Sequence, residues 1–284
     1  MTARVDLRVV ILGLIPQERQ LNETRLTPDG ARYFAAAKQR VARPFHYRWL
    51  LPRLLGQDVR KWKWTTHAAL WACLPLMFVY AGLGWRGVAA GAMVTGLAGV
   101  WSFNRRLPVL VDGTAMAFAL ASAVAVQHGL WPLGLVLALV GGCVRETSPV
   151  FAALYAWNPL ALIGLLAPAL RHLQREGPDV LDDKNRWILD HPMKASREYH
   201  AGLQRAHYIL PWGAAIVALS NFSPQLALTL AVAYGQLFVV TDTVRLYMWA
   251  FPVVLAAAVH AVPLVWLPVL VALQIANPFA SEGS

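Results

Sequence analysis

The sequence predicts an all-helical protein that crosses a membrane about eight or nine times and carries interfacial helices near its N-terminus. Of its 284 residues, 57% are hydrophobic and only 14% are charged, whereas about a quarter of the residues of a typical soluble domain are charged. The apolar residues also form long runs with almost no charge. Backbone inside a bilayer must satisfy its own hydrogen bonds, and these runs are too long for barrel strands, so we expect helices.

The first 65 residues form a basic segment. They contain 13 Lys and Arg against five Asp and Glu, a net charge of +8. Within residues 29–56 cations alternate with bulky apolar groups, which is typical of a segment that lies along a membrane surface. We therefore expect one or two interfacial helices there, with Phe34, Phe45, Trp49 and Leu50 turned inward.

Eight apolar runs follow this segment. A helix needs about 20 residues to cross the hydrocarbon of a bilayer, and several runs meet that length. The last run is 31 residues long and contains three prolines, which is long for one span and short for two. The count is therefore eight or nine. The runs are Thr66–Trp85, Gly87–Trp101, Pro108–Val126, Leu130–Val144, Pro149–Leu170, His207–Phe222, Pro224–Thr241 and Leu246–Ala276.

These runs divide the chain into four parts. The basic interfacial segment occupies residues 1–65, and a first transmembrane bundle occupies residues 66–170. A nearly neutral extramembrane loop at 171–206 contains turn and helix signals and is expected to form helices. The C-terminal transmembrane helices occupy residues 207–284.

Several chemistries find no support in the residues. The two cysteines, Cys73 and Cys143, lie inside apolar runs, so neither a disulfide framework nor a four-cysteine zinc site is expected. The chain has no phosphate-binding glycine motif and no nucleophile elbow. The net charge of +10 would suit either nucleic acid or an anionic membrane surface. Because the chain is so apolar, we expect the basic residues to contact membrane lipids and not nucleic acid. We expect no metal site and no cofactor; a divalent cation is possible, but the sequence does not indicate one.

A few charged residues lie inside or beside the apolar runs. A charge at the centre of a bilayer costs about 2.5–3.5 kcal/mol on insertion scales, so such residues usually face a cavity and mark function. They are expected to bind substrate or to pair with each other and with headgroups. These residues are Arg105, Asp112, the adjacent pair Arg145 and Glu146, and the pair Asp242 and Arg245.

Several short motifs follow one another in a fixed order. These are Thr27-Pro-Asp-Gly-Ala-Arg-Tyr33, Pro44-Phe-His-Tyr-Arg-Trp-Leu-Leu-Pro52, Leu107-Pro108 with Asp112-Gly113, Arg145-Glu146, and Asp242 with Arg245 ahead of an apolar helix that contains proline. In these motifs, which cover most of residues 25–255, the chain resembles the polytopic glycosyltransferases of the GT-C type.

The resemblance implies transfer of a sugar from a polyprenyl-phosphate-linked donor to an acceptor. Asp29 would be the catalytic acid or base, and Arg48, Arg145 or Arg245 would bind the phosphate. The chemistry is consistent with these residue types, because a carboxylate can activate an acceptor hydroxyl while arginines stabilise a departing phosphate. The partners would be membrane lipids and the lipid-linked donor, at a bacterial-type cytoplasmic membrane.

Two questions stay open at the level of sequence. The basic N-terminal segment favours a cytoplasmic location for Asp29, whereas the resemblance implies an extracytoplasmic one. Alternation of the expected spans places Asp29, Arg105 and Arg145 on one face, and Arg245 on the opposite face unless one short segment fails to cross. The alternative functions are a small-molecule or lipid transporter and a membrane scaffold without catalytic activity.

Overall fold

The computed structural model describes residues 27–175, 177–178, 190–201, 203, 205–239 and 244–278. These residues form helices and turns, with no strand among them, so the prediction of an all-helical fold is confirmed for this part of the chain. The main helices are α2 (Pro28–Ala36), α3 (Leu50–Leu55), α4 (Val59–Tyr80), α5 (Trp85–Met93), α7 (Asp112–Gln127), α8 (Trp131–Val144), α9 (Ser148–Ala156), α10 (Leu166–His172), α12 (Pro192–Ala201), α13 (Pro224–Gly235), α15 (Phe251–Ala261) and α16 (Leu267–Ile275).

Short helical elements connect or extend the main helices. They are η1 (Val94–Gly96), η2 (Ala98–Ser102), α6 (Phe103–Arg106), η3 (Pro159–Leu165), η4 (Arg205–Tyr208), η5 (Leu210–Ser220), η6 (Gln236–Phe238), α14 (Val244–Tyr247), η7 (Met248–Ala250) and η8 (Leu264–Trp266).

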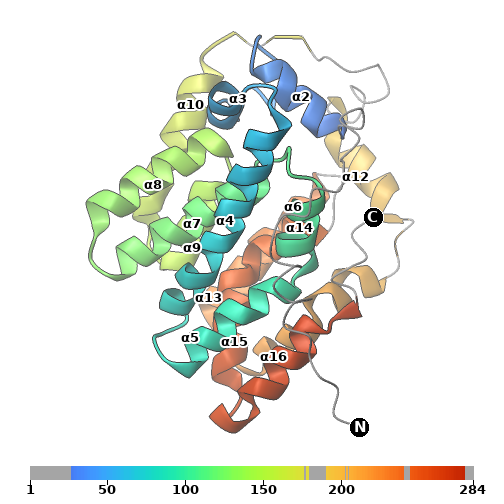
Figure 1. Ribbon diagram of the computed structural model, residues 1–284. Coiled ribbons are helices and arrows are strands. Elements are labelled where there is room, and N and C mark those ends of the chain that lie inside the picture. Colours follow the sequence, from blue (N-terminus) through green and yellow to red (C-terminus); the bar gives the residue numbers. More distant parts are fainter. Residues whose placement is uncertain are drawn as a thin grey trace.

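The helices run back and forth between two ends of a bundle (Figure 1). We call the end that carries α2 and α3 the α2 end and the opposite one the far end. At the α2 end Thr66 donates a hydrogen bond to the carbonyl of Pro108, at 2.9 Å. At the far end the hydroxyl of Tyr80 donates to the carbonyl of Tyr155, also at 2.9 Å. Side-chain hydrogen bonds to backbone thus link neighbouring helices at both ends.

The expected interfacial segment does form two helices, α2 and α3. Thr27 caps α2 by accepting a hydrogen bond from the backbone N–H of Gly30, at 3.1 Å, and Pro28 supplies a favourable first helical residue. Of the four side chains expected to turn inward, Phe45 is buried, whereas Phe34, Trp49 and Leu50 are half-buried.

The expectation of a single span over residues 149–170 is wrong. The chain reverses after α9 at Trp157, whose backbone has a φ of 50°. Asn158 then caps η3 by accepting from the N–H of Leu160, at 3.0 Å, so the run divides into two antiparallel pieces. The second piece ends back at the α2 end, where His172 hydrogen-bonds the hydroxyl of Tyr47 at 2.8 Å.

The 31-residue C-terminal run also divides. One continuous helix covers Val244–Ala261 through α14, η7 and α15, and the chain turns at Val262 and Pro263 into η8 and α16. Val244–Ala261 is the one helix in the described part of the chain that is long and apolar enough to cross a membrane by length and composition. The same test is also passed by core helices of soluble proteins. Among the other expected spans, α4 is long enough, at 22 residues, but not apolar enough, and the rest form shorter or broken helices.

Glycines allow two of the helical elements to pack at very short range. A Cβ atom on Gly142 of α8 would lie 2.2 Å from the carbonyl oxygen of Gly164 in η3. A Cβ atom on Gly164 would in turn lie 2.3 Å from the carbonyl oxygen of Ala138. Only residues without a side chain permit this approach, as expected for small residues in the apolar runs.

Candidate functional site

Six of the eight charged residues singled out in the sequence come together at the α2 end of the bundle. Each lies at or near the end of a helix. Asp29 is in the first turn of α2, Arg48 precedes α3, and Asp112 is the first residue of α7. Arg145 and Glu146 connect α8 to α9, and Arg245 is in α14. We call these six residues, together with Arg32, the charge cluster.

Arg245 links two carboxylates of the charge cluster. Its Nη2 atom donates a hydrogen bond to Oδ2 of Asp29 at 3.0 Å, and its Nη1 atom lies 3.6 Å from Oδ2 of Asp112. Asp112 also forms an ion pair with Arg145 through its other oxygen. The Asp112 side chain is 1% exposed, so this carboxylate joins two arginines and is shielded from solvent.

A further ion pair joins the loop before α3 to the loop after α8. The guanidinium of Arg48 contacts both carboxylate oxygens of Glu146, with a distance of 2.9 Å from Nε to Oε2. Arg48 also donates to the hydroxyl of Tyr33 in α2, at 3.1 Å. A planar guanidinium facing a carboxylate in this way fixes both side chains, so this pair holds the α2 region against the bundle.

Aromatic rings surround the arginines. The ring of Phe45 lies beneath two guanidinium groups, 5.0 Å from that of Arg32 and 5.4 Å from that of Arg48. The guanidinium groups of Arg145 and Arg245 lie over other rings, those of Trp249 and Phe103, at 5.5 and 5.6 Å. A desolvated cation over a ring face gains roughly 2 kcal/mol, which helps to offset the cost of burying it.

Arg32, Tyr33 and the three rings are the part of the site that the sequence reasoning missed. Arg32 and Tyr33 lie three and four residues after Asp29 in α2, which is the spacing of side chains on one helix face, and Arg32 lies 3.8 Å from Asp29. That spacing was a usable signal. No local signal marks Phe45, Phe103 or Trp249, because each meets its arginine only through the fold.

Electrostatics keep the two partly exposed carboxylates ionised. Burial acts to raise the pKa of Asp29, but the charges of Arg245, Arg48 and Arg32 outweigh it and hold that pKa below its ordinary value. Burial likewise acts to raise the pKa of Glu146, and the contact with Arg48 lowers it instead to about 2. Both carboxylates are therefore negatively charged at neutral pH.

Two of the expected site residues are not in the charge cluster. Arg105 lies near the end of α6, is half-buried, and forms no ion pair within the described part of the chain. The expectation that it belongs to the same site is not supported by any contact. Asp242 lies outside the described residues.

The three carboxylates differ in what they can do chemically. Asp112 is enclosed between two cations, and Glu146 has both oxygens occupied by Arg48. Asp29 is 24% exposed, and the contact of its Oδ1 atom with Arg32, at 3.8 Å, is longer than a hydrogen bond. Asp29 therefore keeps an acceptor position for a hydroxyl group, next to an arginine that could bind an anion.

In the described part of the chain, no group of three His, Cys, Asp or Glu side chains is arranged to hold a metal ion. Comparison of the chain with protein-family models, with curated proteins and with solved structures finds no match. The geometry of the charge cluster and the surface of the bundle are therefore the basis for assigning a function.

Proposed function

We propose that the chain is a multi-pass membrane glycosyltransferase of the GT-C type, which transfers a sugar from a polyprenyl-phosphate-linked donor. The observation that carries the proposal is the meeting of Asp29 with Arg245 at one end of an apolar helical bundle. A base that retains acceptor capacity and a cation suited to phosphate are thus in direct contact.

The distribution of side chains supports a membrane location. Charged residues such as Asp112 and Arg145 are buried, with 0% and 4% exposure, while many large apolar side chains face outward. This is the reverse of a soluble protein, in which large exposed apolar surfaces are rare. The outward apolar residues on the short helices include Leu133, Val136, Leu160, Ile163, Leu166, Leu170, Ile216, Leu219, Leu228, Val269 and Leu273.

Exposed tryptophans at the far end support the same location. Four of them lie at turns or helix starts of that end, although they are far apart in the sequence. Amphipathic rings prefer the headgroup level of a bilayer, so this arrangement fits one membrane surface. The tryptophans, with their exposed fractions, are Trp85 (77%), Trp131 (47%), Trp157 (54%) and Trp266 (58%).

The length of α4 also fits a bilayer. This helix has 22 residues and would rise about 33 Å, close to the thickness of the hydrocarbon.

The charge cluster supports a division of labour in sugar transfer. The acceptor oxygen forms a bond to the anomeric carbon of the sugar as the bond from that carbon to the phosphate oxygen breaks. Asp29 accepts the proton of the acceptor hydroxyl, and the phosphate leaves with the bonding electron pair, stabilised by Arg245 and Arg32. Arg48, Glu146, Asp112 and Arg145 position these groups.

Arg245 couples phosphate binding to the activation of Asp29. In the free protein Arg245 donates to Asp29 and lowers its pKa, which makes the carboxylate a weak base. A phosphate that draws Arg245 away removes that hydrogen bond and raises the proton affinity of Asp29. The base is thus strengthened when the donor is bound.

Asp29→Asn tests the proposal. Membranes that contain the wild type or the variant are incubated with radiolabelled sugars on polyprenyl phosphate, and transfer into any acceptor is measured. The variant should insert normally and lose about 10²–10⁴-fold in transfer, as expected for a lost general base. Asp58→Asn is the matched control, because Asp58 is an exposed carboxylate that caps α4.

Two results would contradict the proposal. Equal transfer by the wild type and Asp29→Asn would reject Asp29 as the base. Absence of transfer by the wild type across a panel of donors would reject the glycosyltransferase activity and leave the transporter and the scaffold as the readings to pursue.

A further inference from the structure

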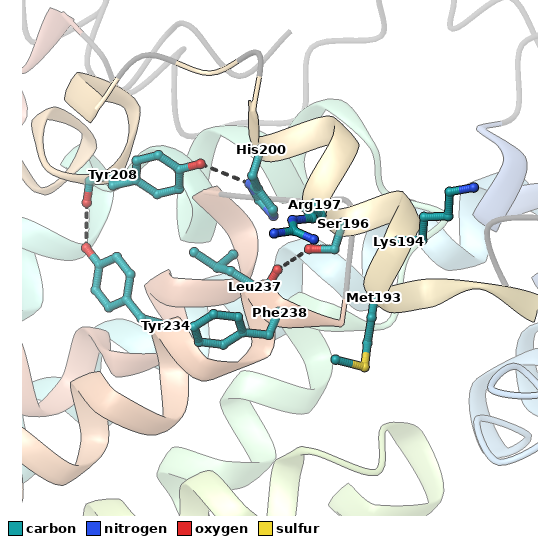
Figure 2. Close-up of a pocket in the computed structure, with 9 residues that line it drawn as sticks. All are labelled: Met193, Lys194, Ser196, Arg197, His200, Tyr208, Tyr234, Leu237 and Phe238. Atoms are coloured by element: carbon teal, nitrogen blue, oxygen red, sulfur yellow. Dashed lines mark hydrogen bonds between the residues drawn. The ribbon is translucent and has the colours of Figure 1, made fainter.

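A large cavity lies between α12 and the C-terminal part of the bundle, apart from the charge cluster. It has a volume of about 820 Å³, which is within the range of pockets that hold small organic ligands. It shares no lining residue with the charge cluster. Its described lining comes from α12, η4, α13 and η6 and consists of Met193, Lys194, Ser196, Arg197, His200, Tyr208, Tyr234, Leu237 and Phe238 (Figure 2).

One wall of the cavity carries positive or polar groups. Arg197 and His200 are three residues apart in α12 and share a helix face, and Figure 2 shows His200 directed toward Tyr208 with the guanidinium of Arg197 beside it. Lys194 is one further turn back on α12 and points away from the cavity centre. The nine described lining residues include no acidic side chain.

Hydrogen bonds hold this wall in place. Ser196 donates to the carbonyl of Leu237, which attaches α12 to η6. The imidazole Nδ1 of His200 is 3.0 Å from the hydroxyl of Tyr208, and Tyr234 donates to the carbonyl of Tyr208. The cavity is therefore a built feature of the fold, and the exposed Arg197 lies on an anchored helix.

The cavity also has an apolar, open side, formed by Met193 at the start of α12 and by residues of α13 and η6. Phe238 is 74% exposed and Met193 is 68% exposed, while Leu237 and the ring of Tyr234 are half-buried. Exposed apolar groups of this size beside a cationic wall are unfavourable in water and favourable against a hydrocarbon chain. The cavity thus offers a place for a charged group next to a place for an alkyl chain.

We propose that this cavity binds an anionic glycerophospholipid. The phosphate of the headgroup contacts Arg197, with His200 beside it, and an acyl chain covers Phe238 and Met193. Arginine suits this role because its guanidinium can bind two phosphate oxygens. The proposal rests on the membrane location proposed above and not on sugar transfer.

The experiment is native mass spectrometry of the full-length protein purified in detergent. The protein is titrated with phosphatidylglycerol, with phosphatidylcholine of the same acyl chains, and with inorganic phosphate. The wild type should retain phosphatidylglycerol in preference to phosphatidylcholine, and millimolar phosphate should not displace it, because phosphate lacks the chain. Polyprenyl phosphate is added as a competitor.

Arg197→Gln should weaken retention of phosphatidylglycerol about tenfold, as expected for loss of one charge-assisted contact. It should weaken retention of phosphatidylcholine less, because the choline cation is repelled by the cationic wall and already weakens the contact of that phosphate with Arg197. Arg60→Gln is the matched control, since Arg60 is an exposed cation at the start of α4, and it should bind as the wild type does. Phe238→Ser should weaken the retention of phosphatidylglycerol and of phosphatidylcholine to a similar degree, because both lipids have the same acyl chains. The thermal midpoint of each variant verifies its fold.

Equal losses in Arg197→Gln and Arg60→Gln would overturn the proposal, because they would show only diffuse attraction to the basic surface. Displacement by phosphate alone, or stronger retention of polyprenyl phosphate than of phosphatidylglycerol, would also overturn it and identify a different ligand. Carbonate extraction of cell membranes separates this failure from failure of the membrane location. A protein released by carbonate would contradict the location, whereas a retained protein without lipid preference would contradict the lipid site alone.

Discussion

The guanidinium of Arg245 bridges Asp29 and Asp112, two carboxylates on helices that are distant in the sequence. Its Nη2 atom lies 3.0 Å from Asp29 and its Nη1 atom lies 3.6 Å from Asp112, and 216 positions separate Arg245 from Asp29. The first helix of the described chain is thereby connected to the helix Val244–Ala261. Through this bridge, contacts between distant helices hold the side chain of Asp29, the proposed catalytic base, in place.

A double-mutant cycle measures the bridge. Arg245→Gln and Asp29→Asn, singly and together, should give an interaction energy of about 1–3 kcal/mol in denaturant unfolding in detergent, because the pair is largely removed from water. The exposed residues Asp58 and Arg60 provide the control cycle through Asp58→Asn and Arg60→Gln. Their coupling should not exceed about 1 kcal/mol. An Asp29–Arg245 coupling no larger than the control value would show that the bridge is not formed in solution.

Acid should destabilise the protein through Glu146. The pKa of this carboxyl is lowered by Arg48 from its ordinary value of 4.5 to about 2, despite the opposing effect of burial. A carboxylate whose pKa is lower in the folded state stabilises the fold above its unfolded pKa and loses that contribution as the pH falls through the folded pKa. The thermal midpoint should therefore fall between about pH 5 and pH 2.

Glu146→Gln is the test of that assignment. The variant should be less stable than the wild type at pH 7, because Arg48 loses its charged partner, and should show a shallower decline of the thermal midpoint toward low pH. Identical pH slopes in the two proteins would assign the acid sensitivity to other carboxylates. Asp29, whose pKa is also lowered, would then be the next candidate.

Gly142→Ala should destabilise the fold by about 1–3 kcal/mol. The new methyl group would lie 2.2 Å from the carbonyl oxygen of Gly164, and backbone at this crossing can move away only by shifting η3 from α8. Gly235→Ala is the control, because a Cβ atom there meets nothing within 4 Å and the residue has helical backbone angles. It should be neutral or stabilising by up to about 1 kcal/mol. The free energy of unfolding of each variant is measured by denaturant unfolding. Equal values for Gly142→Ala and Gly235→Ala would contradict the close packing of α8 against η3.

For the proposed membrane location, the reversal at Trp157 predicts which surfaces share a side of the membrane. In a background without Cys73 and Cys143, single cysteines at Arg53 and Leu173 should react with a membrane-impermeant maleimide from the same side of oriented vesicles, and one at Leu83 should react from the other. Leu173 and Leu83 are 82% and 71% exposed. Labelling of Arg53→Cys and Leu173→Cys from opposite sides would restore the single span over residues 149–170. The side that labels Arg53→Cys also decides the orientation of Asp29.

Much of the fold class is legible in the sequence. The apolar runs indicate helices, and in the structure Thr27, Asp58, Asn158 and Ser223 each cap a helix with a side-chain oxygen, which is a local interaction. The charged residues of the site are also recognisable, since an ionisable group beside an apolar run is costly. These features are local, because they depend on a residue and its near neighbours along the chain.

Other features depend on contacts that no local pattern encodes. The sequence Asn158-Pro159 is a turn signal, yet hydropathy alone joined the residues on either side of it into one span. That error placed Arg245 on the wrong face. The reversal adds one more crossing of the bundle, and it is this crossing that returns Arg245 to the α2 end beside Asp29.

The sequence by itself determined that the protein is helical and that its composition is as apolar as that of a membrane protein. It also determined that a small set of charged residues lies in or beside the apolar runs. Only the tertiary structure decided which of those charges meet: Arg245 with Asp29 and Asp112, and Arg48 with Glu146. The physical reason is the range of the interactions. Helix formation and capping act within a few residues, whereas an ion pair or a cation over a ring requires atoms within about 4–6 Å, and packing alone brings distant segments that close.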